Sequence, residues 1–317
     1  MPDGGTGDGA GETQCGDESD ADHDVVVVGG GPAGCSAAVF ASRYGFDTVV
    51  FDRGRSSIQQ CAYLENYLGF PAGVDVETLY GLFHDHVAEA GGELVADLVE
   101  SVTHAEDGEG FVVATQDGRR VSTDRVVAAT RYDGEYLRPL GDEAMFEAHE
   151  YDGQERERFD RTYPEPDGTT PVDGLYVASP SEEADRQAIV AAGRGARVGL
   201  AVVRDARRAA GYPESVVDHY DWLRQESARD AEWADRDRWR ETYDERRPDD
   251  VEVDDDRWVT LRERDIDRRL STYVTDDEIG RRTERGQRRL LDHVDDELVL
   301  ERARKIEGED DVAEVNR

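Results

Sequence analysis

Residues 25–38 read VVVVGGGPAGCSAA, a continuous apolar run followed at once by glycines and then by small residues. Four consecutive valines are typical of a strand that is buried on both faces of a parallel sheet. The small residues from Pro32 to Tyr44 predict a helix, and Pro32 suits its first turn, where a backbone N–H is not needed. The stretch therefore predicts a strand, a glycine turn and a helix, the opening unit of an α/β fold.

The glycines of this turn have the spacing G-x-G-x-x-G, at Gly29, Gly31 and Gly34. The first permits a tight turn, the second lets the backbone approach a pyrophosphate, and the third allows close helix–strand packing. The free N–H groups at the start of the helix favour an anion. A second predicted strand, Thr48–Phe51, ends at Asp52, an acid placed to bind a ribose diol and to disfavour a 2′-phosphate. This pattern predicts a dinucleotide site; the alternative is a glycine turn that serves packing only.

Further patterns predict a mixed α/β domain followed by a different kind of segment. The predicted elements are a helix at 78–90, hairpin strands at 111–115 and 120–129, a strand at 173–178 and a helix at 186–209. We expect residues 1–22 to be a disordered acidic tail and residues 23–212 to be a Rossmann-like domain, with a parallel sheet and a small antiparallel β-meander. Residues 213–317 hold all four tryptophans between blocks of Arg, Asp and Glu, which predicts a charged helical extension with a thin aromatic stripe.

The composition restricts the partners and the compartment. The formal net charge of −36 repels nucleic acid and anionic membranes, so we expect neither as a partner. Lys305 is the only lysine, and an acid excess of this kind resembles proteins of organisms that live in saturated salt. The three cysteines form no CxxC, and the first residues do not read as a signal peptide. No apolar run has the length of a membrane span, and we expect a cytoplasmic protein.

Several later motifs carry a family resemblance. LENYLGF at 64–70 is followed by a predicted helix, by Ala129-Thr130-Arg131 and finally by RQAIVAAGRG at 186–195. In this order the motifs resemble those of the thioredoxin reductase-like flavoproteins, over roughly residues 24–210. The resemblance implies FAD as the cofactor, with NAD as the alternative that Asp52 also suits. It implies a cofactor site made of Gly29, Gly31, Pro32, Ala33, Gly34, Asp52, Asn66, Thr130, Ser179, Arg186, Gln187 and Ala188.

The sequence departs from that family in three places. Residues 130–173 are too few for the family's NADPH-binding domain, and they contain no second G-x-G-x-x-G. The redox CxxC of thioredoxin reductases is also missing. Arg131 replaces the glycine of the family's ATG turn, and Ser179-Pro180 replaces its GD pair. We therefore expect FAD to bind more weakly than in the family, or to be kept for structure.

Other candidate residues have weaker signals. Cys61 lies in the loop near the expected flavin and is the one candidate for a catalytic thiol, with a buried apolar filler as the alternative. Cys35 follows the phosphate loop; a helix N-terminus can lower the pKa of a thiol, but packing against the sheet is the expectation. His84 and His86 point to different faces of the predicted helix and are expected to be solvated, so we expect no metal site.

These features lead to one main hypothesis and two alternatives. The main hypothesis is a flavin-dependent oxidoreductase that is not a conventional thioredoxin reductase and that exchanges electrons with a small-molecule or protein redox partner. The first alternative is a non-catalytic module that binds a dinucleotide or a partner protein. The second is an NAD-dependent dehydrogenase. A homodimer formed through residues 213–317 is a further option, as is packing of that segment against its own domain.

Overall fold

The computed structural model describes residues 21–54, 56–106, 108–131, 134–151, 154–182, 186–248 and 254–315. The chain divides into two compact units. Unit 1 consists of Met1–Val76 and Phe83–Val203, and unit 2 of Glu77–Leu82 and Arg204–Arg317. Nearly all of the expected disordered tail lies outside the described residues, and the domain boundaries at 22/23 and 212/213 stay predictions.

The chain alternates strands and helices as far as residue 209 and is mainly helical after it. The strands are β1 His23–Val28, β2 Thr48–Phe51, β3 Tyr63–Leu64, β4 Val74–Asp75, β5 Glu93–Val95, β6 Val99–His104, β7 Phe111–Thr115, β8 Arg120–Ala129, β9 Phe146–Tyr151, β10 Gln154–Phe159, β11 Leu175–Ser179, β12 Arg224–Gln225 and β13 Tyr273–Val274. The α-helices are α1 Pro32–Tyr44, α2 Val76–Glu89, α3 Ala188–Ala209, α4 Ala231–Ala234, α5 Arg236–Arg246, α6 Asp255–Ser271, α7 Asp276–Leu291 and α8 Asp296–Val315.

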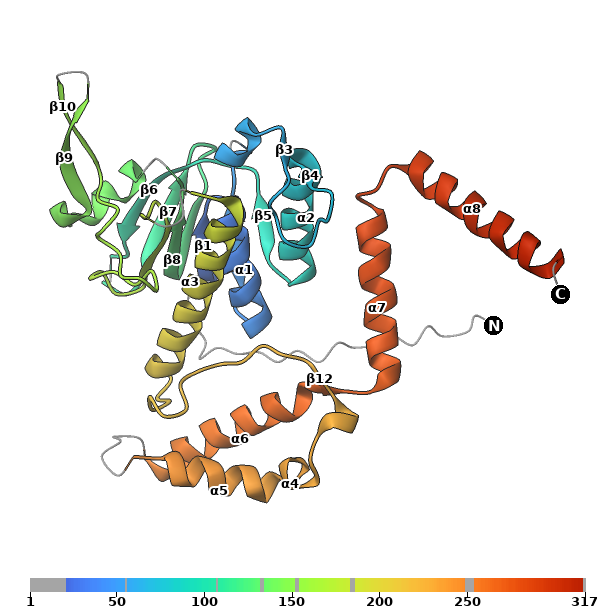
Figure 1. Cartoon of the computed structure of the whole chain (residues 1–317). Helices are drawn as coiled ribbons and strands as arrows, with labels where there is room; N and C mark the ends of the chain where they lie inside the picture. The colour runs from blue at the N-terminus through green and yellow to red at the C-terminus, as the bar shows by residue number, and fades with distance from the viewer. Residues whose placement is uncertain are drawn as a thin grey trace, which may run out of the picture. The chain divides into compact units, whose positions relative to one another are not determined.

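A seven-stranded sheet forms the centre of unit 1. Strands β5, β2, β1, β8 and β11 are parallel neighbours in that order. The first residues of β8 instead pair antiparallel with β7, which pairs antiparallel with β6. Figure 1 shows α1 and the first turns of α3 side by side over one face of this sheet. The predicted parallel sheet with a small antiparallel β-meander is confirmed.

The prediction that the valine run forms a buried strand is confirmed. Val25, Val26 and Val27 are fully buried in β1, between β2 and β8. The helix α1 begins at Pro32 and ends before Gly45, whose φ of 108° places it in the left-handed region. There its N–H caps the helix by donating to the carbonyls of Ala41 and Ser42. The glycine and proline signals therefore determine both ends of this helix.

Most of the other predicted elements have the observed bounds or nearly so. The helix α1 and the strands β2, β7 and β8 match the predicted ranges. The helix α2 begins two residues earlier than predicted, at Val76. The helix α3 begins at Ala188 and not at Arg186, so Arg186 and Gln187 lie in the connection that enters it. Between β8 and β11 the described residues form the 3-10 turns η2 (Glu135–Leu140) and η3 (Glu143–Met145) and the antiparallel β9–β10 hairpin. The expected absence of an NADPH-binding domain stays a prediction.

Unit 2 has a small core of its own, made from the predicted aromatic stripe. Tyr243 of α5 and Trp258 of α6 are buried, together with Leu261 and Ile266. The buried guanidinium of Arg207 lies 2.8 Å (Nη1 to Oδ1) from the buried carboxylate of Asp265, which also accepts a hydrogen bond from the Tyr243 hydroxyl. These aromatic residues therefore serve the core of unit 2.

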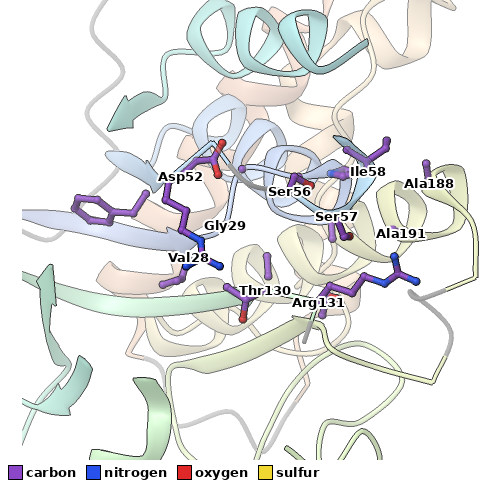
Figure 2. Close-up of a pocket in the computed structure, with 18 of the residues that line it drawn as sticks. Val28, Gly29, Asp52, Ser56, Ser57, Ile58, Thr130, Arg131, Ala188 and Ala191 are labelled. Atoms are coloured by element: carbon purple, nitrogen blue, oxygen red, sulfur yellow. The ribbon is translucent and has the colours of Figure 1, made fainter. Parts of the chain in front are cut away.

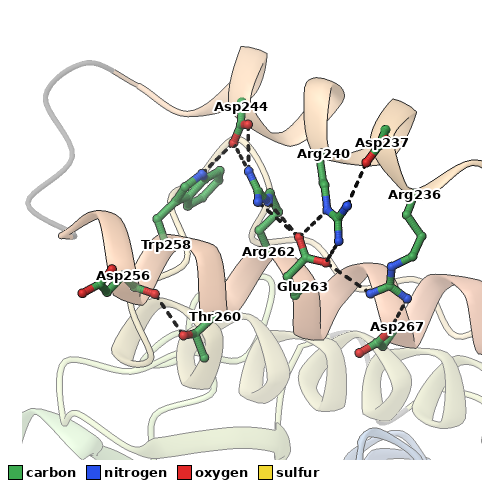
Figure 3. A network of polar contacts seen from close by, with 10 residues as sticks. All are labelled: Arg236, Asp237, Arg240, Asp244, Asp256, Trp258, Thr260, Arg262, Glu263 and Asp267. Atoms are coloured by element: carbon green, nitrogen blue, oxygen red, sulfur yellow. Dashed lines mark hydrogen bonds and ion pairs between the residues drawn. The ribbon is translucent and has the colours of Figure 1, made fainter.

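An ion-pair network joins α5 to α6 on the outside of that core. Glu263 accepts hydrogen bonds from Nε and Nη2 of Arg240, both at 2.8 Å, and from Nη2 of Arg236 at 3.2 Å (Figure 3). The Arg240 guanidinium is the main reason why the pKa of Glu263 falls to about 2. Arginine suits this arrangement because its planar fork can meet both oxygens of a carboxylate.

Candidate functional site

A cavity of about 1000 Å³ opens at the carboxyl ends of the parallel strands of unit 1. Ligands of open α/β sheets bind at this edge, where loops leave the strands. The cavity is lined from the ends of β1, β2, β8 and β11 and from the first turns of α1 and α3 (Figure 2). Its volume lies at the upper end of the roughly 300–1000 Å³ that is usual for small-molecule sites.

The glycine loop forms one wall of this cavity. Gly29 has a φ of 109°, which favours glycine, and its N–H donates to the Phe51 carbonyl at 2.8 Å. A Cβ on Gly34 would lie 1.8 Å from the Gly29 carbonyl oxygen, so glycine is needed where α1 approaches β1. No side chain caps the N-terminus of α1 at Gly31. The helix end therefore faces the cavity with backbone N–H groups, the arrangement that favours a phosphate.

Asp52 lies beside this loop, at the end of β2. Its Oδ1 accepts a hydrogen bond from the Gly54 N–H at 3.1 Å. Its Oδ2 lies 3.4 Å from Nε2 of His84, and the same nitrogen lies 3.2 Å from the Gly30 carbonyl oxygen. The hydrogen bond to Asp52 is the main reason why the pKa of His84 rises above its usual value. The expectation that His84 is a solvated surface residue is therefore wrong, whereas His86 is exposed as expected.

Of the residues expected around the flavin, Ser179, Arg186, Gln187 and Ala188 line the cavity, whereas Asn66 is outside its lining and contacts Gln187. The Asn66 side-chain amide donates to Oε1 of Gln187 at 2.9 Å, which joins two motifs far apart in the chain. Arg186, Gln187 and Ala188 line the cavity at the entry to α3. Ser179 is buried in the cavity wall, and a cis peptide bond joins it to Pro180.

The turn after β8 carries the residue that departs most from the family. The hydroxyl of Thr130 donates to the Tyr136 hydroxyl at 3.2 Å. Arg131 is half-buried and lines the cavity, with its side chain directed toward the α3 side in Figure 2. Arg131 therefore brings a guanidinium to the cavity wall, at the position where the family that this sequence resembles has glycine.

The two described cysteines differ sharply in environment. Cys35 is buried in α1, and its thiol donates to the Gly30 carbonyl at 3.1 Å. Burial, with a smaller contribution from the Asp52 charge, raises the pKa of Cys35 to about 12. The packing interpretation of Cys35 is confirmed, and a lowered thiol pKa is contradicted. Cys61 is exposed and lines the cavity, so a buried filler is the wrong interpretation for it, and its chemical role stays a prediction.

Sequence patterns missed part of the site. The connection between β5 and β6 contributes Asp97 and Leu98 to the cavity wall, the start of β6 contributes Glu100, and the 3-10 turn η2 contributes Tyr136. The only signal for the first group was its place directly after a short strand of the parallel sheet. Among the described residues no group of three His, Cys, Asp or Glu side chains could hold a metal ion. In the same part of the chain, no helix combines the length and the apolar character that crossing a membrane requires.

Known proteins resemble the first part of this chain. Residues 23–140 match the family described as pyridine nucleotide-disulphide oxidoreductase. The bifunctional thioredoxin reductase/thioredoxin of Mycobacterium leprae is 31% identical over 126 residues, 39% of this chain and 27% of that protein. The thioredoxin reductase of Listeria monocytogenes is 28% identical over 125 residues, 39% of this chain and 38% of that protein. The chain thus spans less than two fifths of the length of these relatives.

A solved structure also aligns with this chain. A thioredoxin reductase from Gloeobacter violaceus aligns with a TM-score of 0.49 at 17% identity, covering 64% of this chain and 98% of that one. The matched residues 23–140 include the glycine loop, Asp52, Asn66 and Thr130. The assignment of individual residues of this chain to a cofactor stays a prediction.

Proposed function

We propose that this chain, whose residues 23–140 belong to the thioredoxin reductase-like branch of the pyridine nucleotide-disulphide oxidoreductases, binds FAD in the cavity of unit 1. The observation that carries the proposal is that the N-terminus of α1 and the carboxylate of Asp52 line the same cavity. The backbone N–H groups at the start of α1 suit a diphosphate, and Asp52 beside them suits the adenosine ribose.

The rest of the cavity suits the flavin half of the same molecule. Asn66 and Gln187 are joined by a hydrogen bond and lie at the entry to α3, the helix that begins at Ala188. Backbone N–H groups at a helix N-terminus favour negative charge, and a reduced flavin carries negative charge at the N1–O2 edge of its ring. Bound FAD would supply the electron transfer, and the residues of this chain bind and orient it.

The second part of the function is the transfer of electrons between the flavin and a partner. Because the cysteines of the sequence stand at positions 15, 35 and 61, we propose that electrons pass between the flavin and a small-molecule or protein partner without a CxxC of this sequence. The relatives are named as thioredoxin reductases, which makes thioredoxin the first protein partner to test. Cys61, exposed at the cavity, is the thiol to examine in that test. The cytoplasm is the compartment we propose, since both described cysteines are free.

The decisive experiment identifies the molecule that copurifies with the protein. The protein is purified in molar KCl, heat-denatured and centrifuged, and the supernatant is analysed by mass spectrometry. We expect FAD, and a visible absorption band near about 450 nm before denaturation. Release of NAD would support the dehydrogenase alternative. A colourless protein that takes up no FAD would contradict the flavoprotein proposal and leave the non-catalytic module.

The oxidoreductase part has a separate test. The yellow protein is mixed with NADH or NADPH under anaerobic conditions, and bleaching of the flavin band is followed with time. Bleaching by either nucleotide would support an oxidoreductase with a small-molecule donor. If dithionite alone bleaches the band and no partner reoxidises it, the flavin serves structure and the enzyme proposal fails.

We also propose that unit 2 mediates self-association. Its last two helices expose large apolar side chains, among them Leu290, Leu291, Leu298 and Leu300. Several large exposed apolar side chains on neighbouring helices of the sequence are a reason to test for an interaction surface. Light scattering in molar KCl would measure the mass of the full chain, and Leu290→Asp with Leu298→Asp should reduce a dimer to a monomer. A wild-type monomer would contradict this proposal.

A further inference from the structure

One imidazole nitrogen in unit 1 faces two acceptors from two other segments. Nε2 of His84, on α2, lies 3.2 Å from the Gly30 carbonyl oxygen and 3.4 Å from Oδ2 of Asp52. Gly30 belongs to the phosphate loop, and Asp52 follows β2. These two segments touch directly, since a Cβ on Gly30 would lie 2.7 Å from Cβ of Asp52. His84 therefore lies where the two parts of the adenosine site meet.

The chemistry of the three groups determines which of them donates the hydrogen bonds. A carbonyl oxygen accepts only, and so does an ionised carboxylate. Nε2 must then carry the proton, either in the neutral Nε2–H tautomer or in the imidazolium ion. The raised pKa of His84 favours the imidazolium form, and Asp85, the next residue on α2, contributes to that shift after Asp52 and Gly30.

The contacts hold both acceptors in place. Asp52 is fixed at Oδ1 by the Gly54 N–H and at Oδ2 by His84, which restricts rotation of the carboxylate. The Gly30 carbonyl accepts from the Cys35 thiol as well as from His84, which fixes the orientation of that peptide group in the loop.

We propose that His84 is a positioning residue for the adenosine half of the cofactor. It holds the carboxylate that would bind the ribose and the loop peptide next to the diphosphate position in one arrangement. The proposal rests on the proposed function only in that the ligand is an adenine dinucleotide; it holds equally for FAD and for NAD. His84 does not touch the reacting part of the cofactor, so its effect should be on binding.

The first test compares three variants on the same helix. Binding of ADP, the fragment that FAD and NAD share, is measured by calorimetry on the apoprotein in molar KCl. Since hydrogen bonds to charged groups are the strong ones, we expect His84→Leu to weaken ADP binding by about tenfold. His84→Gln keeps an N–H donor and should stay within about threefold of wild type. His86→Leu, two residues along on the exposed side, is the matched control and should bind as wild type does.

The second test separates positioning from a general effect on folding. If His84 acts through Asp52, then His84→Leu should cost little in a protein that already carries Asp52→Asn. Independent, additive losses from the two substitutions would overturn the proposal, and so would wild-type affinity in His84→Leu. Where His84→Leu fails to fold, His84→Asn replaces it, because its shorter amide does not extend to Asp52. A wild-type protein that binds neither ADP nor FAD would instead overturn the proposed function itself.

Discussion

The close contact of α3 with α1 can be tested at a single glycine. A Cβ on Gly195 of α3 would lie 2.0 Å from the carbonyl oxygen of Ala33, and 2.7 Å and 2.9 Å from its carbonyl carbon and Cα. Ordinary van der Waals contact begins at 3.4 Å. Gly195→Ala therefore requires the two helix backbones to separate by about 1.4 Å, the difference between 3.4 Å and 2.0 Å. Because all three atoms are backbone, no side chain can rotate away.

The size of the effect follows from that separation. Overfilling a well-packed contact costs about 1–3 kcal/mol, and the rigid backbone partner places this site at the upper end. For a unit of this size, about 2–3 kcal/mol corresponds to a fall in Tm of roughly 4–12 °C. Ala33 also lines the cavity, so the displaced helix start should weaken ADP binding as well.

Gly193 supplies a matched control two residues earlier on the same helix. No atom would lie within 4 Å of a Cβ there, and the residue is exposed. Gly193→Ala should therefore stabilise the helix by up to about 1 kcal/mol, since alanine is the better helix former. Thermal unfolding of both variants is followed by circular dichroism in molar KCl. If Gly195→Ala melts at or above the wild-type Tm and binds ADP as tightly, the close approach of α3 to α1 is wrong.

Three further predictions concern protonation and reactivity. The pKa of His84 is raised in the folded protein, so the stability that His84 contributes should be complete below about pH 6.5. That contribution should be lost as the pH rises through the folded pKa. The variant His84→Gln should show no such step when Tm is measured against pH. The pKa of Glu263 is lowered to about 2, so the stability that Glu263 contributes should be present above about pH 4.5 and be lost as the pH falls toward 2. In unfolding measurements, Glu263→Gln should remove this acid-induced loss of stability. The control Glu245→Gln, at an exposed position on α5, should keep it. In a Cys15→Ser protein, iodoacetamide at pH 8 should alkylate Cys61 and leave Cys35 unmodified until the protein unfolds. Mass spectrometry identifies the alkylated residue. Labelling of Cys35 in the folded protein would contradict its burial.

Local signals were sufficient for the core of unit 1. The valines of β1, Pro32 at the start of α1 and Gly45 after its end act on their own few residues, through burial on both faces and through allowed φ values. The turn at 116–118 similarly sets the β7–β8 hairpin. In each case the physical cause lies within one element, so the amino-acid pattern is enough to locate it.

Long-range packing decided the rest of the candidate site. A pattern could show that His84 lies on a helix but not which residues that helix meets, and the meeting with Gly30 bridges 54 positions of sequence. The hydrogen bond between Asn66 and Gln187 bridges 121 positions. The parallel sheet brings these segments together because its strand ends share one edge, and which loop faces which there depends on strand order. The glycine loop and Asp52 could therefore be predicted from the sequence. The contact between His84 and Asp52 could be found only in the folded unit.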